Sequence, residues 1–178
     1  MVQIRRIATD EQELWEQARE LRRRILLEPL GFTMELFDQE FPDFARVAET
    51  FVGVIDHPKG ERVVGVVCLL PGVHAEGEGK LMQMAVDEQR RREGIGRQLV
   101  AELERRAFGE LGLRELFCHS RLHAVPFYAE LGWTVEGDEF DEAGVPHLRM
   151  VFRPTVDASA PSPDVAGGAM DANTSEGQ

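Results

Sequence analysis

LMQMAVDEQRRREGIGRQLV, residues 81–100, is the stretch that decides the fold of this 178-residue chain. Its first six residues are mostly apolar, as in a buried strand, and they run into a charged turn. From Gly94 the period changes, because Ile95 and Leu99 begin an apolar repeat every four residues that predicts a long helix ending near Gly112. The stretch therefore reads as a strand, an arginine- and glycine-rich turn, and the N-terminus of a helix.

Such a turn is a natural place for an anion. The first N–H groups of a helix have no partner within it, and the helix dipole is positive at that end. Gly94 and Gly96 let the backbone approach a phosphate closely, and the side chains of Arg91, Arg92 and Arg97 offer charge-assisted hydrogen bonds. The glycine spacing fits neither the dinucleotide fingerprint nor the Walker loop. A plain tight turn with solvated arginines, and a site for some other phosphate compound, are the alternatives.

Strand and helix patterns alternate along the rest of the chain. We expect strands at residues 3–8, 50–56, 62–70, 79–86, 114–119, 133–137 and 147–152. We expect helices at residues 10–27, with Asp10 as the N-cap, at 38–48, and at 124–131. The strand, helix, strand passage from 80 to 119 predicts a parallel crossover, so the fold class is a single-domain α/β fold with a mixed sheet.

Composition narrows the classes of function. The net charge of -12 argues against nucleic-acid binding, because affinity for phosphate backbones comes from an excess of Lys and Arg. No apolar run is long enough to span a membrane and no secretory signal is evident, so we expect a cytoplasmic protein. Cys68 and Cys118 lie singly in apolar runs without the spacing of a metal site, so we predict buried thiols and no bound metal.

The last part of the chain differs in composition from the rest. Residues 154–178 are rich in Ala, Gly, Pro, Ser and Asp and contain no Leu, Ile, aromatic, Lys or Arg residue. Such a segment has too little apolar surface to pack. We therefore predict one folded domain at residues 1–153 and a disordered acidic tail at residues 154–178.

The Arg-x-x-Gly-x-Gly pattern of Arg91, Gly94 and Gly96, directly after the apolar strand end, resembles the acyl-CoA signature of the GNAT N-acetyltransferases. The resemblance implies a mostly antiparallel mixed sheet with a parallel, splayed central strand pair flanked by helices. It implies acetyl-CoA as the acetyl donor. Carried over by position, the residues expected to bind it are Met84, Ala85 and Val86 along the pantetheine arm, and Arg91, Arg92, Glu93, Gly94, Ile95, Gly96 and Arg97 at the diphosphate.

The passage AVPFYAELGW, residues 124–133, is similar to the GNAT helix and strand that follow the cofactor cleft. Tyr128 then takes the position of the tyrosine that protonates the departing CoA thiolate in many members. A phenol suits that task, since the sulfur leaving group needs a proton. The alternative interpretation is a core aromatic that packs beside Phe127.

The base that deprotonates the acceptor is not evident. Many family members use a glutamate on the strand before the signature, whereas this strand carries Gln83, which is no base at neutral pH. His119, His123 and His147 are possible replacements, and each has the alternative reading of a histidine that caps a turn. Residues 137–150 are similar to a small bacterial subgroup whose ending reads F-x-E-x-G-I-P-H. As acceptor-binding residues we expect Gln83, Glu139 and His147.

The sequence therefore predicts an N-acetyltransferase that moves an acetyl group from acetyl-CoA to a primary amine by direct attack. Tyr128 is the expected general acid. The expected acceptor is a small-molecule or protein amine, which an acidic rim would attract, and the chain is expected to be a monomer or a homodimer without nucleic-acid or membrane partners. The rival prediction is a fold that binds acyl-CoA without turnover, as a sensor or interaction module.

Overall fold

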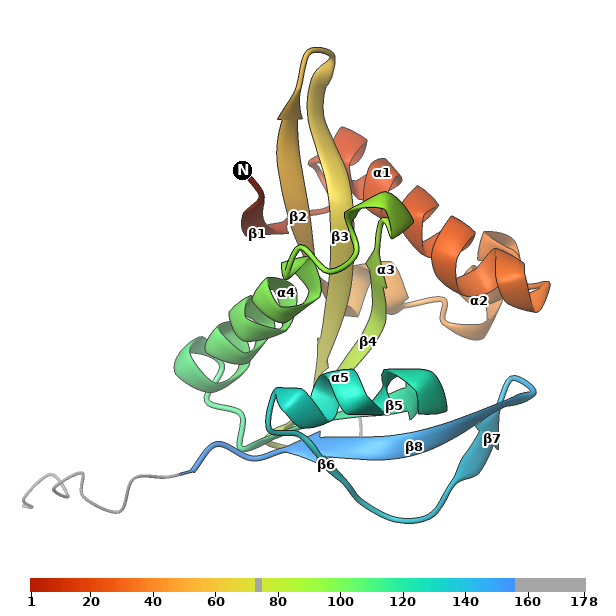
Figure 1. Cartoon of the computed structure of the whole chain (residues 1–178), viewed down its shortest axis with the longest axis vertical. Helices are drawn as coiled ribbons and strands as arrows, with labels where there is room; N and C mark the ends of the chain where they lie inside the picture. The colour runs from red at the N-terminus through yellow and green to blue at the C-terminus, as the bar shows by residue number, and fades with distance from the viewer. Residues whose placement is uncertain (73–74, 156–178) are drawn as a thin grey trace, which may run out of the picture.

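The structure is a computed structural model that describes residues 1–72 and 75–155. Its centre is an eight-stranded sheet (Figure 1) with the order β1-β2-β3-β4-β5-β8-β6, and β7 pairs with β8. The strands are β1 (Gln3–Ile7), β2 (Glu49–His57), β3 (Gly60–Pro71), β4 (Glu78–Val86), β5 (Glu115–Arg121), β6 (Thr134–Val135), β7 (Phe140–Glu142) and β8 (Val145–Phe152). All neighbouring strands are antiparallel except β4 and β5, which confirms the mixed sheet and the parallel crossover.

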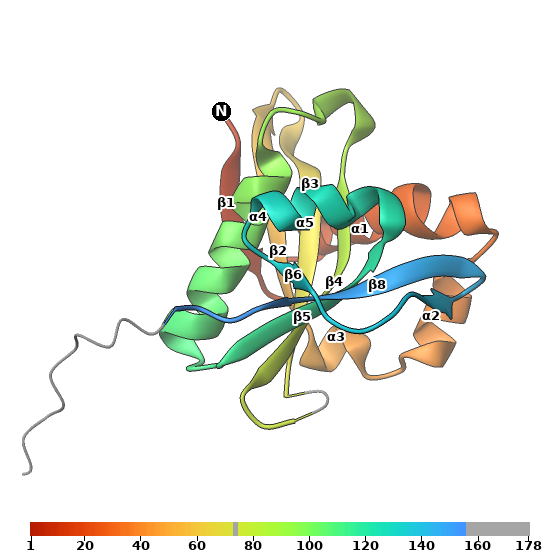
Figure 2. The ribbon, with the colours of Figure 1, turned by 60° about the horizontal axis from the view of Figure 1, so that its bottom comes forward.

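Helices cover both faces of the sheet (Figure 2). One core lies under α1 (Gln12–Arg22), α2 (Met34–Glu40) and α3 (Phe44–Val47). The other lies under α4 (Ile95–Glu104) and α5 (Val125–Glu130). Short segments of other helical types complete the set: η1 (Arg23–Leu27), η2 (Glu28–Leu30), η3 (Glu88–Arg90), η4 (Arg105–Glu110) and η5 (Leu122–Ala124). Because both faces are covered, β3 is buried almost continuously from Val63 to Leu70.

Several local expectations were wrong. Asp10 does not cap α1, since the N-cap is Glu11 and no side chain bonds the helix end. The helix expected at 38–48 is two short helices, because Thr33 starts α2 earlier by accepting a hydrogen bond from the Leu36 N–H at 3.2 Å, and Pro42 interrupts the segment. Of the strand expected at 133–137, only β6 forms, and β7 was not expected.

A glycine on β3 allows α4 to lie close to the sheet. A Cβ atom added to Gly65 would lie 2.8 Å from Ile95 Cγ2 and 2.9 Å from Leu99 Cδ1. Both apolar side chains are fully buried, so the space that a larger residue would need is already filled. This contact sets where the N-terminus of α4 stands relative to β4.

The two parallel strands separate soon after they meet. β4 and β5 pair only from Glu78 to Lys80, and beyond that point β4 has a partner on its β3 side alone. A bulge lies at the point of separation, where Gln83 and Met84 together face the single residue Val67 of β3. Gln83 has a φ of 55°, a left-handed conformation that is rare outside glycine. The splayed pair expected from the sequence is thus confirmed.

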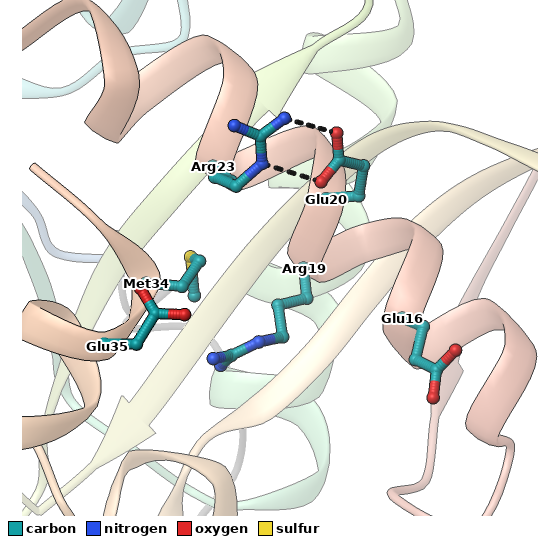
Figure 3. Close-up of a pocket in the computed structure, with 6 residues that line it drawn as sticks. All are labelled: Glu16, Arg19, Glu20, Arg23, Met34 and Glu35. Carbon is teal, nitrogen blue, oxygen red and sulfur yellow. Dashed lines mark hydrogen bonds and ion pairs between the residues drawn. The ribbon is translucent and has the colours of Figure 1, made fainter.

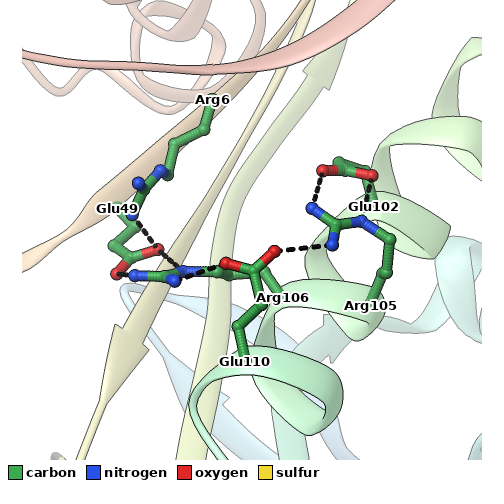
Figure 4. A network of polar contacts seen from close by, with 6 residues as sticks. All are labelled: Arg6, Glu49, Glu102, Arg105, Arg106 and Glu110. Atoms are coloured by element: carbon green, nitrogen blue, oxygen red, sulfur yellow. Dashed lines mark hydrogen bonds and ion pairs between the residues drawn. The ribbon is translucent and has the colours of Figure 1, made fainter.

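An ion-pair network ties the far end of the crossover helix to the sheet (Figure 4). The Arg106 guanidinium donates to both carboxylate oxygens of Glu49, at 2.7 and 2.8 Å, and Arg6 approaches the same carboxylate at 3.1 Å. Glu110 then bridges Arg106 to Arg105. Bidentate pairs of this kind are among the stronger polar contacts, so they anchor η4 beside the start of β2.

The segment expected as a disordered tail, residues 154–178, lies outside the described residues except for Pro154 and Thr155. Within residues 1–72 and 75–155, no helix has both the length and the apolar character needed to cross a membrane.

Candidate active site

A cleft of about 950 Å³ opens where β4 and β5 separate. β4 contributes residues 80–86 to its walls and β5 contributes residues 118–121. The remaining wall comes from η1, η2, α2, α5 and the turn between β7 and β8. Its size is that of a small-molecule site.

The free edge of β4 forms one wall of this cleft. Ala85 and Val86 pair with Val66 and Gly65 of β3, so their other side faces the cleft rather than a strand. Met84 lies at the bulge and also lines the cleft. A strand edge without a neighbour offers N–H and C=O groups to an extended ligand. The three residues predicted to meet the pantetheine arm therefore lie together on the cleft wall.

The turn after β4 is anchored by Asp87. Its carboxylate accepts a hydrogen bond from the Gln89 N–H at 3.1 Å, and its own N–H donates to the Val64 carbonyl oxygen at 2.9 Å. The guanidinium groups of Arg62 and Arg24 lie 3.4 and 3.6 Å from the same carboxylate. Asp87 is buried, so these contacts compensate its charge and hold the turn in one conformation.

The turn ends at the open N-terminus of α4. Gly94 is the N-cap residue and has a φ of 75°, which favours glycine. In the described chain, the N–H groups of Arg92, Glu93 and Gly94 donate to no backbone carbonyl. The Ile95 side chain is buried in the core, so only its backbone faces the turn. A Cβ atom on Gly96 would lie 2.8 Å from Met84 Cε, which shows how closely the helix approaches β4.

The charged side chains of this turn differ in their surroundings. Arg91 lines the cleft, with its guanidinium 3.6 Å from the Glu88 carboxylate. Arg92 is exposed and forms no ion pair with a described residue, and Arg97 lies 3.7 Å from Glu130. Glu93 is held by a neighbouring arginine through an ion pair of 2.8 Å. The rim of the turn is therefore positive and accessible.

Tyr128 of α5 faces the β4 bulge across the cleft. Its side chain is only 6% exposed and packs against Phe127 and Trp133, with ring centroids 5.1 and 5.4 Å away. Its hydroxyl donates to Met84 Sδ at 3.5 Å, and the residue lines the cleft. Burial, and next the neighbouring Cys118, raise the phenol pKa well above its usual value of 10. Tyr128 is thus both a packed aromatic and a protonated hydroxyl at the cleft.

His147 of β8 lines the cleft and is 7% exposed. Its Nδ1 lies 2.8 Å from the carbonyl oxygen of Val145. A carbonyl oxygen only accepts, so Nδ1 carries a hydrogen, and in the neutral form of the ring Nε2 is the nitrogen with the lone pair. That Nε2 lies 4.0 Å from Glu142 Oε2. The backbone contact that the turn-capping interpretation requires therefore exists, and the second nitrogen faces the Glu142 carboxylate without a hydrogen bond to a described residue. His123 is exposed at the rim of the cleft.

A second group of polar side chains surrounds Glu142, an exposed residue that lines the cleft. Glu142 Oε1 lies 2.8 Å from His119 Nδ1, and Lys80 Nζ lies 3.4 Å from the same nitrogen. Burial lowers the Lys80 pKa, whereas the hydrogen bond with His119 is the main cause that lowers the Glu142 pKa. Glu139, which we expected in the acceptor site, is exposed and is not among the residues that line the cleft.

Some of the cleft was not foreseen. Sequence reasoning missed Lys80, Glu142 and Arg121, and it missed an apolar wall formed by Leu26, Leu30, Phe32, Leu36, Phe37 and Phe41. The sequence did contain one sign of a special arginine in α1, because Arg22 interrupts the apolar stripe that includes Ala18 and Leu21. The structure shows that Arg22 is buried with that stripe. Across residues 1–72 and 75–155, no three His, Cys, Asp or Glu side chains are grouped as metal ligands would be.

A smaller depression of about 210 Å³ lies elsewhere, on the outer side of α1 (Figure 3). Its charged side chains already have partners: Arg23 forms two hydrogen bonds with Glu20, and Arg19 is paired with Asp38. Both arginines of the depression are therefore already paired with carboxylates, so neither is free to bind an anion. The cleft between β4 and β5 is therefore the better candidate site.

A splayed parallel strand pair, a bulge, and a glycine turn that opens a helix define an acyl-CoA-binding α/β class. Residues 43–154 match the family model described as the acetyltransferase (GNAT) domain, so the chain belongs to the GNAT acetyltransferase family. Members of this family are acyltransferases that use acetyl-CoA.

Individual relatives agree with that assignment. The chain is 35% identical to YjcF, an uncharacterized N-acetyltransferase of Bacillus subtilis, over 77 residues. This matched stretch is 43% of this chain and 54% of the relative. A putative N-acetyltransferase from Lactobacillus plantarum has a similar structure, with a TM-score of 0.70 at 23% identity over 85% of this chain and 97% of that chain. An aminoglycoside 6'-N-acetyltransferase solved with coenzyme A has a TM-score of 0.68 at 17% identity over 91% and 99%. The matched stretches span 39%, 54% and 47% of three curated relatives.

Proposed function

We propose that this chain transfers an acetyl group from acetyl-CoA to a primary amine, of a small molecule or a protein, by direct attack on the thioester. One observation carries the proposal: the open β4 edge and the Tyr128 hydroxyl border one cleft, and Arg91 extends its wall to the turn whose next N–H groups donate to no backbone carbonyl of a described residue. Acetyl-CoA supplies an activated acetyl group as its thioester.

The residues present suit that donor. The edge of β4 from Met84 to Val86 would pair with the amide groups of the pantetheine arm, as a neighbouring strand would. The turn from Arg91 to Arg97 would hold the diphosphate, because it combines free N–H groups, a helix N-terminus and accessible arginines. The cleft volume of about 950 Å³ leaves room for an acceptor beside the arm.

The reaction forms a C–N bond and breaks the C–S bond. N–H groups at the β4 bulge would stabilise the negative charge that develops on the acetyl oxygen. Tyr128 would give its phenol proton to the departing sulfur, and its raised pKa keeps that proton in place at neutral pH. The phenolate is then reprotonated from solvent.

The attacking amine must lose a proton. Among the three histidines considered from the sequence, His147 is the best candidate, because it lines the cleft and the Val145 carbonyl would fix its neutral tautomer, which leaves the lone pair on Nε2. Glu142 would stabilise the imidazolium that results. His119 is less suited, since its Nδ1 is already engaged with the same carboxylate.

We also predict a cytoplasmic location. The rival to the proposed function is the binding of acyl-CoA without turnover. Incubation of the protein with acetyl-CoA and a panel of primary amines separates the two functions. An enzyme releases CoA thiol in step with an acetylated amine that mass spectrometry identifies. If CoA raises the melting temperature while no amine in the panel is acetylated, the sensor function replaces the proposed one.

A further inference from the structure

Two arginines on the acceptor side of the cleft have no carboxylate partner among the described residues. Arg22 of α1 is 4% exposed, and Arg121 of β5 is half-buried and lines the cleft. Burial lowers the pKa of both guanidinium groups. Buried charges in proteins are normally paired. Two that are not paired, beside a cleft, indicate an anionic ligand.

Arg22 lies directly behind the cleft wall. Its guanidinium lies against the rings of Phe37 and Phe44, at 4.9 and 4.8 Å from their centroids. Its Nη2 is buried and has no hydrogen-bond partner in the described chain. The aromatic faces offset part of the cost of this buried cation, but they supply no hydrogen-bond acceptor. The charge therefore stays available to an anion on the other side of the wall.

Arg22 also fixes the orientation of Gln83. The Arg22 Nε donates to Gln83 Oε1 at 3.1 Å, and a guanidinium has no acceptor, so the amide oxygen must face the arginine. The amide nitrogen of Gln83 then faces away from the arginine and has no partner among the described residues. Because Gln83 lines the cleft, it offers the acceptor two N–H donors rather than a carbonyl oxygen.

Arg121 lines the same cleft as Gln83, from the other of the two separating strands. Its Nη2 donates to the carbonyl oxygen of Leu26 at 3.0 Å, which leaves its other N–H groups free. Leu26 follows Arg22 by one helical turn, so the same side of this helical segment contacts both Gln83 on β4 and Arg121 on β5. The two donors thus lie on the two strands that border the opening, and one helical segment contacts both of them.

No carboxylate of the described residues forms an ion pair with these arginines, although Asp38 attracts Arg22 from a distance. Glu142 is bonded to His119 and lies near Lys80, and Asp38 is paired with Arg19. Glu40 is exposed at the rim of the cleft. In a chain of net charge -12, this side of the cleft is rich in donors and positive charge. It is suited to an anion, not to the polycation that the overall charge suggests.

Building on the proposed function, we infer that the acceptor is an amine that also carries a carboxylate and an apolar body. Arg121 and the Gln83 amide bind the carboxylate, and the apolar wall that includes Leu26, Phe32 and Leu36 packs against the body. Arg22 acts through Gln83 as a positioning residue.

The test compares phenylalanine, phenylalaninamide and 2-phenylethylamine as acceptors of the acetyl group. We expect kcat/KM for phenylalanine to exceed that for the amide by about 10-fold or more. Arg121→Gln should lower the ratio of these two kcat/KM values by about 10- to 100-fold. The different basicities of the two amines affect wild type and variant equally, so they cancel when the ratios are compared. Arg121→Lys keeps a charge and should recover part of the ratio. Arg46→Gln, on the exposed surface of α3, is the matched control and should leave the ratio unchanged.

A binding experiment separates this inference from the acetyl transfer itself. We expect 3-phenylpropionate to bind the CoA-loaded protein more tightly than 3-phenylpropanamide by calorimetry, and Arg121→Gln to remove that preference. If acid and amide bind equally, or Arg121→Gln leaves the preference intact, the inference is wrong even if amines are acetylated. Preferential binding of the acid without any acetyl transfer would instead support the inference and overturn the proposed function.

Discussion

The Tyr128 hydroxyl donates to Met84 Sδ at 3.5 Å, so the helix after the crossover and the bulge of β4 meet at one point of the cleft. A thioether is a weak acceptor, and the other hydrogen-bond partner of the hydroxyl, the Cys118 side chain, is a weakly bonding thiol. The phenol is thus held in position without a strong partner. A sulfur atom of a ligand in the cleft would compete easily for the same proton.

Tyr128→Phe should lower kcat by about 10- to 100-fold while the CoA affinity changes little, because the ring stays packed and only the proton donor is lost. Thiol release and calorimetric CoA titration measure the two quantities. An acid works only while protonated, and burial raises this phenol pKa, so the wild-type kcat should show no decline assignable to Tyr128 between pH 8 and 10. An unchanged kcat in the variant would rule out the role.

Gly94→Ala should weaken CoA binding by about 10-fold, because the left-handed N-cap position at a φ of 75° becomes strained and the N–H groups shift. The strain should also cost about 1 kcal/mol of unfolding free energy. Gly112→Ala is the matched control, since Gly112 has a φ of 63° at the far end of the crossover and open space around it. It should lose similar stability and keep its CoA affinity. Equal CoA affinities in the two variants would contradict the binding site.

His147→Ala should lower kcat/KM by about 100-fold or more, and added imidazole should restore part of the rate if His147 removes the proton of the amine. His57→Gln, in the distant hairpin of β2 and β3, is the control and should not respond to imidazole. A structural role for His147 through its Val145 contact would reduce the melting temperature without rescue. Absence of rescue in a folded variant would therefore argue against the base.

Glu49→Gln should lower the free energy of unfolding by about 1 to 2 kcal/mol at pH 7, because the half-buried bidentate contact with Arg106 loses its charge. Arg106 lowers the Glu49 pKa, so this stability is present above the usual value of 4.5 and is lost as the pH falls through the folded-state pKa. The difference from wild type should therefore shrink near pH 3. Glu20→Gln, in an exposed pair, should change stability by less than about 0.5 kcal/mol. A difference that persists in acid would refute the pairing.

Much of the fold follows from local sequence signals. The change from strand to helix period at Gly94, and the turn residues between β2 and β3, act over a few neighbours and could be read directly. The helix expected at 38–48 could not be predicted correctly in this way, because the Thr33 cap and Pro42 together divide a pattern that looked continuous. Where a cap and a weak periodicity compete, the hydrogen bond decides the boundary.

The candidate site likewise contains residues that local sequence patterns predict and residues that they do not. The turn and Tyr128 lie within recognisable local patterns, whereas the surroundings of Glu142 depend on β7 and β5 both pairing with β8. The contact of Arg121 with Leu26 joins residues that lie far apart in the sequence. Such long-range neighbours leave no periodic trace in one sequence, which is why Glu139 was selected in place of Glu142.

Titration of the ¹⁵N-labelled protein with CoA tests the central claim most directly, because amide shifts report which N–H groups meet the ligand. The account predicts the largest changes at Arg92–Arg97 and at Met84–Val86, and small changes at the depression beside Arg19 and Arg23. Saturating CoA that leaves the amides of the turn and of β4 unmoved would contradict it.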